Sequence, residues 1–405
     1  MTKHKSINLA LQGGGAHGAF TWGVLDLLLE REEVGFGTIG GTSAGALNAV
    51  ALAAGLADGG RAGARAKLDE VWTAIYKAGV PDLVWMNPLM WSLSAVPMAG
   101  MSRLFSPYDL NPLGIDPLRQ LLTQTIDFEA VRRAPVELEI VATDVATGRA
   151  RFFAREELTV DMVLASACLP TLHHAAEIDG RAYWDGGFSA NPDLVNLAMT
   201  SAVEDTLIVL LNPSVQTALP VSAKEIVAHQ NLLTFNAPLL RDVAVIEAVR
   251  ESEQGWLRRA LAPKSRVSPL ARHRFHLIEA GRHTRVLSAD SKMKPDWGMF
   301  QNLRSAGRQE THLWLDTQWR SVGRRSSVDL KARFLAEPVA GRGRRAVAAT
   351  AAGKGEGPGK GEGRGKGEGP GKGEGRGVVG AEGVRTDGRQ NGVPQTAAAS
   401  RGEPV

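Results

Sequence analysis

The sequence predicts an α/β protein whose mainly parallel sheet is covered on both faces by helices. Short apolar segments typical of strands alternate with longer segments whose apolar residues recur at helical spacing. Residues 206–211 (Thr-Leu-Ile-Val-Leu-Leu) are almost entirely apolar, as expected of a strand buried on both faces. Because parallel strands need crossover connections, alternating strands and helices favour a parallel sheet.

The first predicted unit is a strand, a glycine-rich loop and a helix. Residues 6–11 form the strand, and residues 19–30 show the apolar spacing of a helix. Between them, residues 13–18 read Gly-Gly-Gly-Ala-His-Gly. Glycines allow close backbone approach, and N–H groups at a helix N-terminus favour an anion. The loop is therefore a candidate oxyanion hole.

The second predicted unit places a serine on a glycine frame. Ser43 lies between Gly41 and Gly45, after a short strand at residues 38–41 and before an alanine- and leucine-rich helix at residues 44–57. A Gly-x-Ser-x-Gly segment in a strand–turn–helix context is typical of a hydrolase nucleophile. Ser43 is therefore the candidate nucleophile.

The remaining elements continue the alternation and end in a hairpin that carries a carboxylate. Further helices are expected at residues 64–78, 117–125 and 159–167, and further strands at residues 136–143, 151–153, 176–178, 182–184, 206–211 and 274–280. An Asp-Gly pair at residues 179–180 predicts the hairpin turn. That hairpin presents Asp185, which is followed by Gly186 and Gly187.

A serine hydroxyl needs a base to take its proton. The chain has nine histidines, and none lies in a strong catalytic signature. Asp185 is the better candidate, because a carboxylate beside Ser43 that is partly removed from water would become basic enough to accept the proton. A Ser-His-Asp triad stays open as the alternative.

The glycine loop, the Ser43 turn and the Asp185-Gly-Gly segment, in this order, resemble the patatin-like phospholipase family. The similarity extends from about residue 7 to residue 211 and continues more weakly to about residue 322. The resemblance implies a three-layer α/β/α fold, a Ser43-Asp185 dyad and hydrolysis of lipid acyl esters through an acyl-serine intermediate. It implies no cofactor, and we find no convincing metal-ligand cluster in the sequence.

In this interpretation, the oxyanion hole comprises Gly13, Gly14, Gly15 and the residue after the nucleophile, Ala44. Family members often carry Arg at the position of His17, where it can order the loop or hold a phosphate. A histidine is largely neutral at pH 7. Acyl-ester hydrolysis is therefore a firmer expectation than recognition of a phospholipid head group.

Composition divides the chain into a hydrolase domain at residues 1–335 and a disordered tail at residues 338–405. The catalytic motifs lie at residues 7–211, and a C-terminal helical part is expected at residues 222–322. The tail is rich in Gly, Lys, Glu and Arg, and it cannot bury enough apolar surface to offset its ordering entropy.

Charge, partners and location follow from the same division. From residue 341 onward there are twelve Lys and Arg against seven Asp and Glu, which leaves 35 basic and 36 acidic residues before it. We expect no nucleic-acid partner for the core. Without an apolar run typical of a signal peptide or membrane span, the expected location is cytoplasmic, with a lipid or acyl-ester substrate. Transient membrane contact stays open.

Two further points stay open at this level. Residues 83–101 are uncharged and rich in Trp and Met, so they could form an acyl-chain wall or an ordinary buried connection. The chain could also be a lipid-binding or regulatory protein whose dyad is little used.

Overall fold

The computed structural model describes residues 4–78, 106–216, 219–253, 268–284, 287, 291–292 and 296–336. The compact unit that carries the sheet extends over Met1–Val339. The predicted tail and the apolar segment at residues 83–101 lie outside the described residues.

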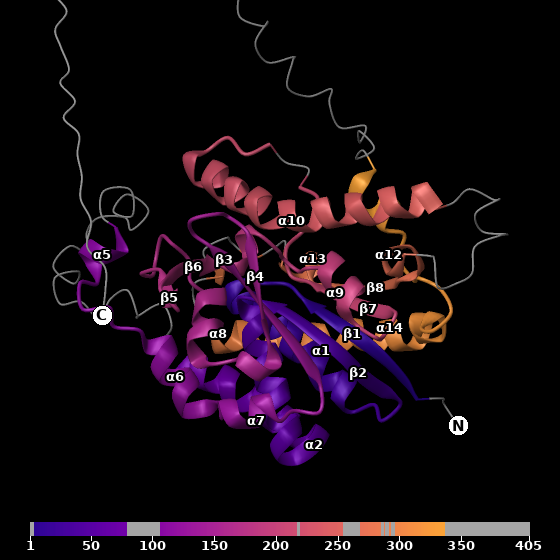
Figure 1. Cartoon of the computed structure of the whole chain (residues 1–405), viewed down its shortest axis with the longest axis horizontal. Helices are drawn as coiled ribbons and strands as arrows, with labels where there is room; N and C mark the ends of the chain where they lie inside the picture. The colour runs from indigo at the N-terminus through magenta and orange to yellow at the C-terminus, as the bar shows by residue number, and fades with distance from the viewer. Residues whose placement is uncertain are drawn as a thin grey trace, which may run out of the picture. The chain divides into compact units, whose positions relative to one another are not determined.

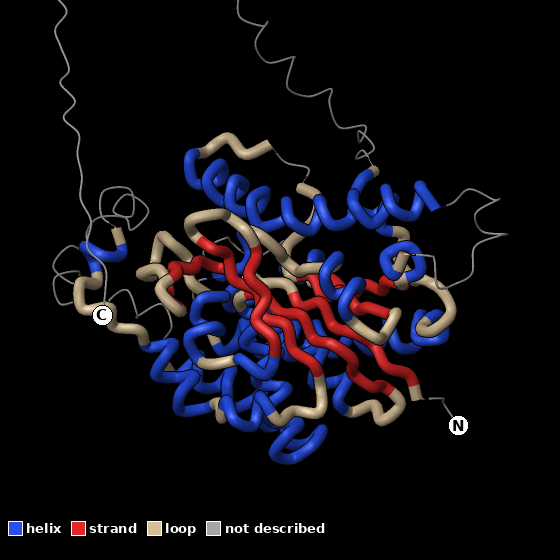
Figure 2. Tube along the Cα trace, viewed as in Figure 1, coloured by secondary structure: helices blue, strands red, loops and turns tan. Residues whose placement is uncertain are grey.

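A mixed sheet with a parallel centre forms the middle layer (Figure 2). Its strands are β1 (Lys5–Leu11), β2 (Val34–Thr42), β3 (Glu137–Asp144), β4 (Ala150–Ala154), β5 (Ala176–Ile178), β6 (Arg181–Asp185), β7 (Asp205–Leu210) and β8 (Arg274–Glu279). The order is β5-β6-β3-β2-β1-β7-β8, with β4 also paired to β3. The run β3-β2-β1-β7-β8 is parallel, and the pairs made by β4, β5 and β6 are antiparallel. The predicted mainly parallel sheet is confirmed.

Helices cover both faces of this sheet, each over its own apolar cluster (Figure 1). One face holds α1 (Ala19–Leu29), α2 (Ala44–Lys77), α6 (Pro117–Thr125), α7 (Phe128–Arg132), α8 (Val160–Ser166) and α14 (Trp297–Gln318). The other holds α9 (Val195–Thr200), α10 (Ala223–Glu253) and α12 (Pro269–Arg272). The short helices α5 (Pro107–Leu110) and α13 (Gly281–Thr284) complete the described set. The result is the predicted three-layer α/β/α arrangement.

Two of the predicted helices form one element interrupted by a break. The helices expected at residues 44–57 and 64–78 lie within α2, where Gly59 and Gly60 have non-helical backbone angles. Gly60 has a φ of 59°, a conformation that favours glycine. The break lets the two halves of α2 fold against each other: a Cβ on Gly55 would lie 2.4 Å from the Cα of Ala64.

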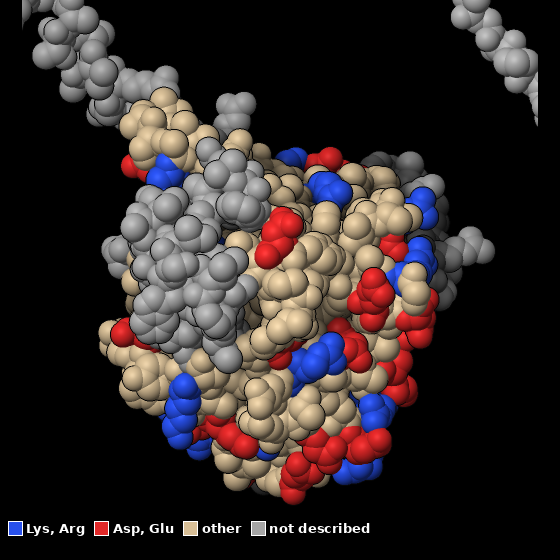
Figure 3. Space-filling model, turned by 90° about the vertical axis from the view of Figure 1, so that its left-hand side faces the viewer, with Lys and Arg blue, Asp and Glu red and all other residues tan. Residues whose placement is uncertain are grey.

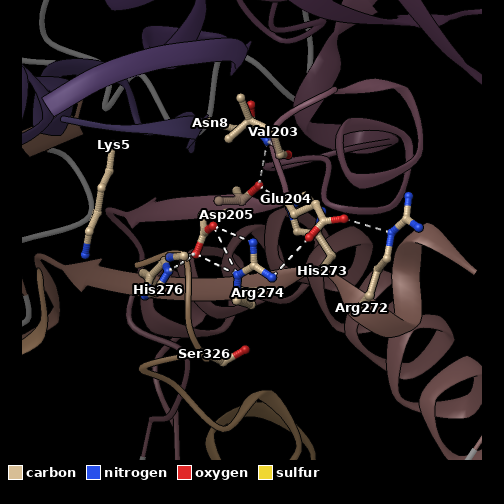
Figure 4. Close-up of polar contacts among 12 residues, drawn as sticks. Lys5, Asn8, Val203, Glu204, Asp205, Arg272, His273, Arg274, His276 and Ser326 are labelled. Atoms are coloured by element: carbon tan, nitrogen blue, oxygen red, sulfur yellow. Dashed lines mark hydrogen bonds and ion pairs between the residues drawn. The ribbon is translucent and has the colours of Figure 1, made fainter. Parts of the chain in front are cut away.

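An ion-pair cluster joins the first residues of β7 and β8 (Figure 4). Asp205 accepts hydrogen bonds from Arg274 Nε at 3.0 Å, His276 Nε2 at 3.1 Å and the Gly323 N–H at 2.9 Å. Burial would raise the pKa of Asp205, but these donors hold it well below its usual range. This cluster lies at the amino ends of the parallel strands, whereas Ser43 follows the carboxyl end of β2. His276 is therefore a packed structural residue.

Charged side chains of both signs are mixed on the face drawn in Figure 3. They gather mainly toward the lower and right-hand edges, and the centre of the view is largely uncharged (Figure 3). Among the described residues drawn there, neither sign of charge predominates (Figure 3).

Candidate active site

Ser43 occupies a sharp turn between β2 and α2. Its φ of 53° and ψ of −120° are strained for a residue with a side chain, and such strain is typical of a nucleophile turn. The turn is tight because Gly45 crosses β1 closely: a Cβ there would lie 2.2 Å from the Leu11 carbonyl oxygen. The Ser43 N–H donates to Ser166 Oγ at 2.9 Å, which anchors the turn. Ser43 is partly exposed at the resulting bend.

Strand register brings Asp185 to Ser43. Along one edge of β3, the β2 residue Thr42 pairs with Val141, and the next β3 residue, Ala142, pairs with Asp185 of β6. The other edge of β3 is occupied by β4. The last residue of β2 and the last residue of β6 therefore meet along one edge of β3, since these strands run in opposite directions. This junction places the Asp185 carboxylate beside the Ser43 turn.

Asp185 is buried, with 2% of its surface exposed. Burial raises the pKa of its carboxyl to about 7, although hydrogen bonds from the Gly187 N–H and the Ser43 side chain lower it. The Gly187 N–H donates to Asp185 Oδ1 at 2.7 Å. Thr143 Oγ1 donates to the Asp185 carbonyl at 2.8 Å. The carboxylate is thus fixed in place and basic enough to accept a proton near neutral pH.

The glycine loop lies directly against Ser43. A Cβ on Gly13 would lie 2.9 Å from Ser43 Cβ, so only glycine allows this approach. Gly15 has a φ of 57°, and a Cβ there would lie 2.4 Å from the Lys292 carbonyl oxygen. Gly14 is partly exposed and Gly15 is exposed, so their backbones reach the surface beside the serine.

Gly13 differs from the other residues expected in the oxyanion hole. Its N–H donates to Asn191 Oδ1 at 2.7 Å and is therefore not available to an oxyanion. No hydrogen bond within the described part of the chain uses the N–H groups of Gly14, Gly15 or Ala44. The expectation for Gly13 as a donor is corrected, because a long-range side chain has taken its N–H.

His17 contacts a segment that is distant in the sequence. The ring is 2% exposed, and its Nε2 lies 2.7 Å from Ser291 Oγ. Burial, with the nearby Lys292 ammonium, lowers the pKa of His17 to about 3. The ring is neutral at pH 7 and buried, so it cannot supply the cation that an arginine would bring to this position.

No hydrogen bond in the described ranges joins a histidine ring to Ser43 or Asp185. Two other serines close to the site have structural partners. Ser166 is fully buried beneath the Ser43 N–H, and Ser189 Oγ lies 2.8 Å from Thr143 Oγ1. Ser43 differs from Ser166 by being partly exposed, and its side chain hydrogen-bonds the Asp185 carboxylate.

A comparison with models of known protein families shows which family this sequence matches. The family model described as patatin-like phospholipase matches residues 9–197. Residues 9–197 therefore correspond to a patatin-like phospholipase domain. The match includes the glycine loop, Ser43 and Asp185, and it makes this patatin-like chain a lipid acyl hydrolase in general terms, acting on lipid substrates.

Other comparisons add little to this assignment. Among solved structures, VipD from Legionella pneumophila shares 17% sequence identity with the patatin-like chain, over 78% of this chain and 67% of VipD, with a TM-score of 0.36. No match was found among curated proteins.

The residues that support the site were not all visible in the sequence. Gln12, Ser166 and Asn191 hold the loop and the turn through long-range hydrogen bonds. For Gln12 and Asn191, the one local indication of this role is their position in the sequence: Gln12 precedes the glycines, and Asn191 follows the Asp185 segment. Among described residues, no cluster of three His, Cys, Asp or Glu could hold a metal ion, and no described helix is both long and apolar enough to cross a bilayer.

Proposed function

We propose that this chain is a serine acyl-ester hydrolase of the phospholipase A type that uses a Ser43-Asp185 dyad. The observation that carries the proposal is the meeting of a strained, partly exposed serine with a buried carboxylate whose pKa is raised to about 7. Such a carboxylate can take the hydroxyl proton at neutral pH.

In the proposed acylation step, Asp185 accepts the Ser43 proton while Oγ attacks the ester carbonyl. The N–H groups of Gly14, Gly15 and Ala44 donate to the oxyanion of the tetrahedral intermediate, and the N-terminus of α2 adds a favourable dipole. The C–O bond to the alcohol then breaks, and Asp185 returns the proton to that alkoxide oxygen. The product is an acyl ester on Ser43.

In the proposed deacylation step, Asp185 accepts a proton from water, which attacks the acyl-Ser43 carbonyl. The same N–H groups stabilise the second tetrahedral intermediate. When this intermediate collapses, the bond to Ser43 Oγ breaks and Asp185 gives the proton back to the serine. The fatty acid leaves, and no redox partner is required.

Ser43→Ala should abolish labelling by a fluorophosphonate probe and turnover of acyl esters, because the nucleophilic oxygen is gone. Asp185→Asn should lower kcat by about 10²- to 10⁴-fold, the usual contribution of a general base, while leaving the fold intact. Ester turnover, probe labelling and circular dichroism measure these effects.

Ser189→Ala is the matched control, since it removes a nearby serine hydroxyl and should leave labelling in place. Persistent labelling of Ser43→Ala would contradict the proposed nucleophile. If Asp185→Asn stayed active while a single His→Ala variant was inactive, the histidine alternative would replace the dyad. A wild-type protein that binds lipid vesicles but is neither labelled nor active would support the lipid-binding alternative.

A further inference from the structure

Asn191 lies where three segments meet: the glycine loop, the residues that follow Asp185, and α10. Its side chain is 1% exposed. Oδ1 accepts the 2.7 Å hydrogen bond from the Gly13 N–H, and Nδ2 donates at 3.0 Å to the Phe235 carbonyl in α10. Both ends of the amide are used, so only one orientation satisfies the N–H on one side and the carbonyl on the other.

The backbone of Asn191 also holds the loop. Gln12 Nε2 donates to the Asn191 carbonyl at 3.2 Å. Gln12 Oε1 in turn accepts from the N–H groups of Leu211 at 2.8 Å and Asn212 at 2.9 Å, which follow β7. The start of the glycine loop is thereby tied to the end of a central strand and to Asn191 at once.

The same segment is tied to the nucleophile and to the base. Thr42 Oγ1 donates to the Ala190 carbonyl at 2.9 Å, just before Ser43. Phe235, whose carbonyl Asn191 binds, lies against Gly187, where a Cβ would be 2.4 Å from Phe235 Cδ1. Asn191 therefore joins α10 to a continuous set of contacts that includes both halves of the dyad.

We propose that Asn191 is a positioning residue that sets the geometry of the glycine loop. This role rests on the proposed hydrolase function. By accepting the Gly13 N–H, Asn191 fixes the Gln12–Gly13 peptide plane, which is the anchored end of the loop that carries the Gly14 and Gly15 N–H groups. Without this acceptor the buried Gly13 N–H is unsatisfied, and the loop turns to pair it elsewhere.

Asn191→Leu is the main test, because leucine has a similar size but cannot accept or donate. With a soluble short-chain p-nitrophenyl ester, kcat should fall about 10- to 100-fold, approaching the loss of one oxyanion donor. KM should stay within about twofold, since ground-state binding does not use the loop N–H groups. A kcat equal to that of the wild type, or an increase in KM with no change in kcat, would overturn the proposal.

Asn236→Leu is the matched control. Asn236 follows Phe235 in α10, and its Nδ2 donates to the Pro213 carbonyl at 3.0 Å, outside the loop. Its kcat and KM should match the wild type. A loss of kcat equal to that of Asn191→Leu would mean that general loosening of α10, and not the Gly13 hydrogen bond, controls the rate.

Amide hydrogen exchange tests the same contact without any activity. Exchange of the Gly13 amide should accelerate at least tenfold in Asn191→Leu, while β1 stays protected. Asn191→Asp keeps an acceptor oxygen and should keep Gly13 protected. Unchanged exchange in Asn191→Leu would overturn the proposal.

Two provisions keep this test decisive. If the leucine variant does not fold, Asn191→Ser makes the same comparison, because its shorter side chain leaves Gly13 without its acceptor. If the wild type neither hydrolyses esters nor labels at Ser43, the proposed function fails, and the exchange result still decides whether Asn191 holds the loop.

Discussion

At the scale of single residues, Asp185 controls how the proposed reaction responds to pH. Its carboxyl group must be ionised to accept the Ser43 proton, and burial raises its pKa to about 7. Below that pH the protonated fraction grows and the base is lost. The histidine of the glycine loop cannot produce the same profile near neutrality, because the pKa of His17 is lowered to about 3.

We therefore expect kcat/KM to rise about tenfold per pH unit below pH 7 and to level off above it. Initial rates with a soluble ester from pH 5 to pH 9 measure this profile, with circular dichroism at each pH to exclude unfolding. A flat profile down to pH 5 would mean that Asp185 is ionised throughout or is not the base.

At the scale of elements, α1 and α14 approach so closely that their backbones touch. A Cβ on Gly23 would lie 2.0 Å from the Arg304 carbonyl oxygen, and one on Gly307 would lie 2.1 Å from the Phe20 carbonyl oxygen. Because both obstacles are backbone atoms, no side chain can move aside. The contact supports α1, which begins just after the glycine loop.

Gly307→Ala should lower the free energy of unfolding by about 1–3 kcal/mol, the usual effect of overpacking. Gly59→Ala is the control, since a Cβ at Gly59 would meet nothing within 4 Å. Urea unfolding followed by circular dichroism measures both variants. Equal stability of the two variants would contradict the close helix packing.

At the scale of the whole molecule, the sheet and its two helical layers lie within Met1–Val339. The apolar clusters on both faces consist of residues before 335. The composition of residues 338–405 predicts that this segment adds little to the folded core.

A chain ending at Val339 should keep the melting temperature of the full chain within about 2 °C, because it loses no residue of either apolar cluster. It should also keep its kcat on a soluble ester. Differential scanning calorimetry and initial rates measure both. A clear fall in melting temperature would show that the last residues pack against the core.

The fold was largely predictable because its signals are local. The apolar spacing of residues 19–30 and the Asp-Gly pair at residues 179–180 depend on neighbours in the chain, and the corresponding elements α1 and the β5–β6 hairpin are present. Two helices at residues 44–57 and 64–78 were predicted, and the break at Gly59 and Gly60 separates them, but the packing of one against the other through Gly55 and Ala64 was not predictable from local sequence.

The sequence by itself determined the strand–turn–helix around Ser43, the glycine loop before α1 and the hairpin that ends at Asp185, because glycine placement and apolar spacing specify backbone locally. Only the tertiary structure decided that β2 and β6 meet along β3, and that Asn191 takes the Gly13 N–H. Strand order, register and the choice of hydrogen-bond partner depend on packing between distant segments, so no local pattern encodes them.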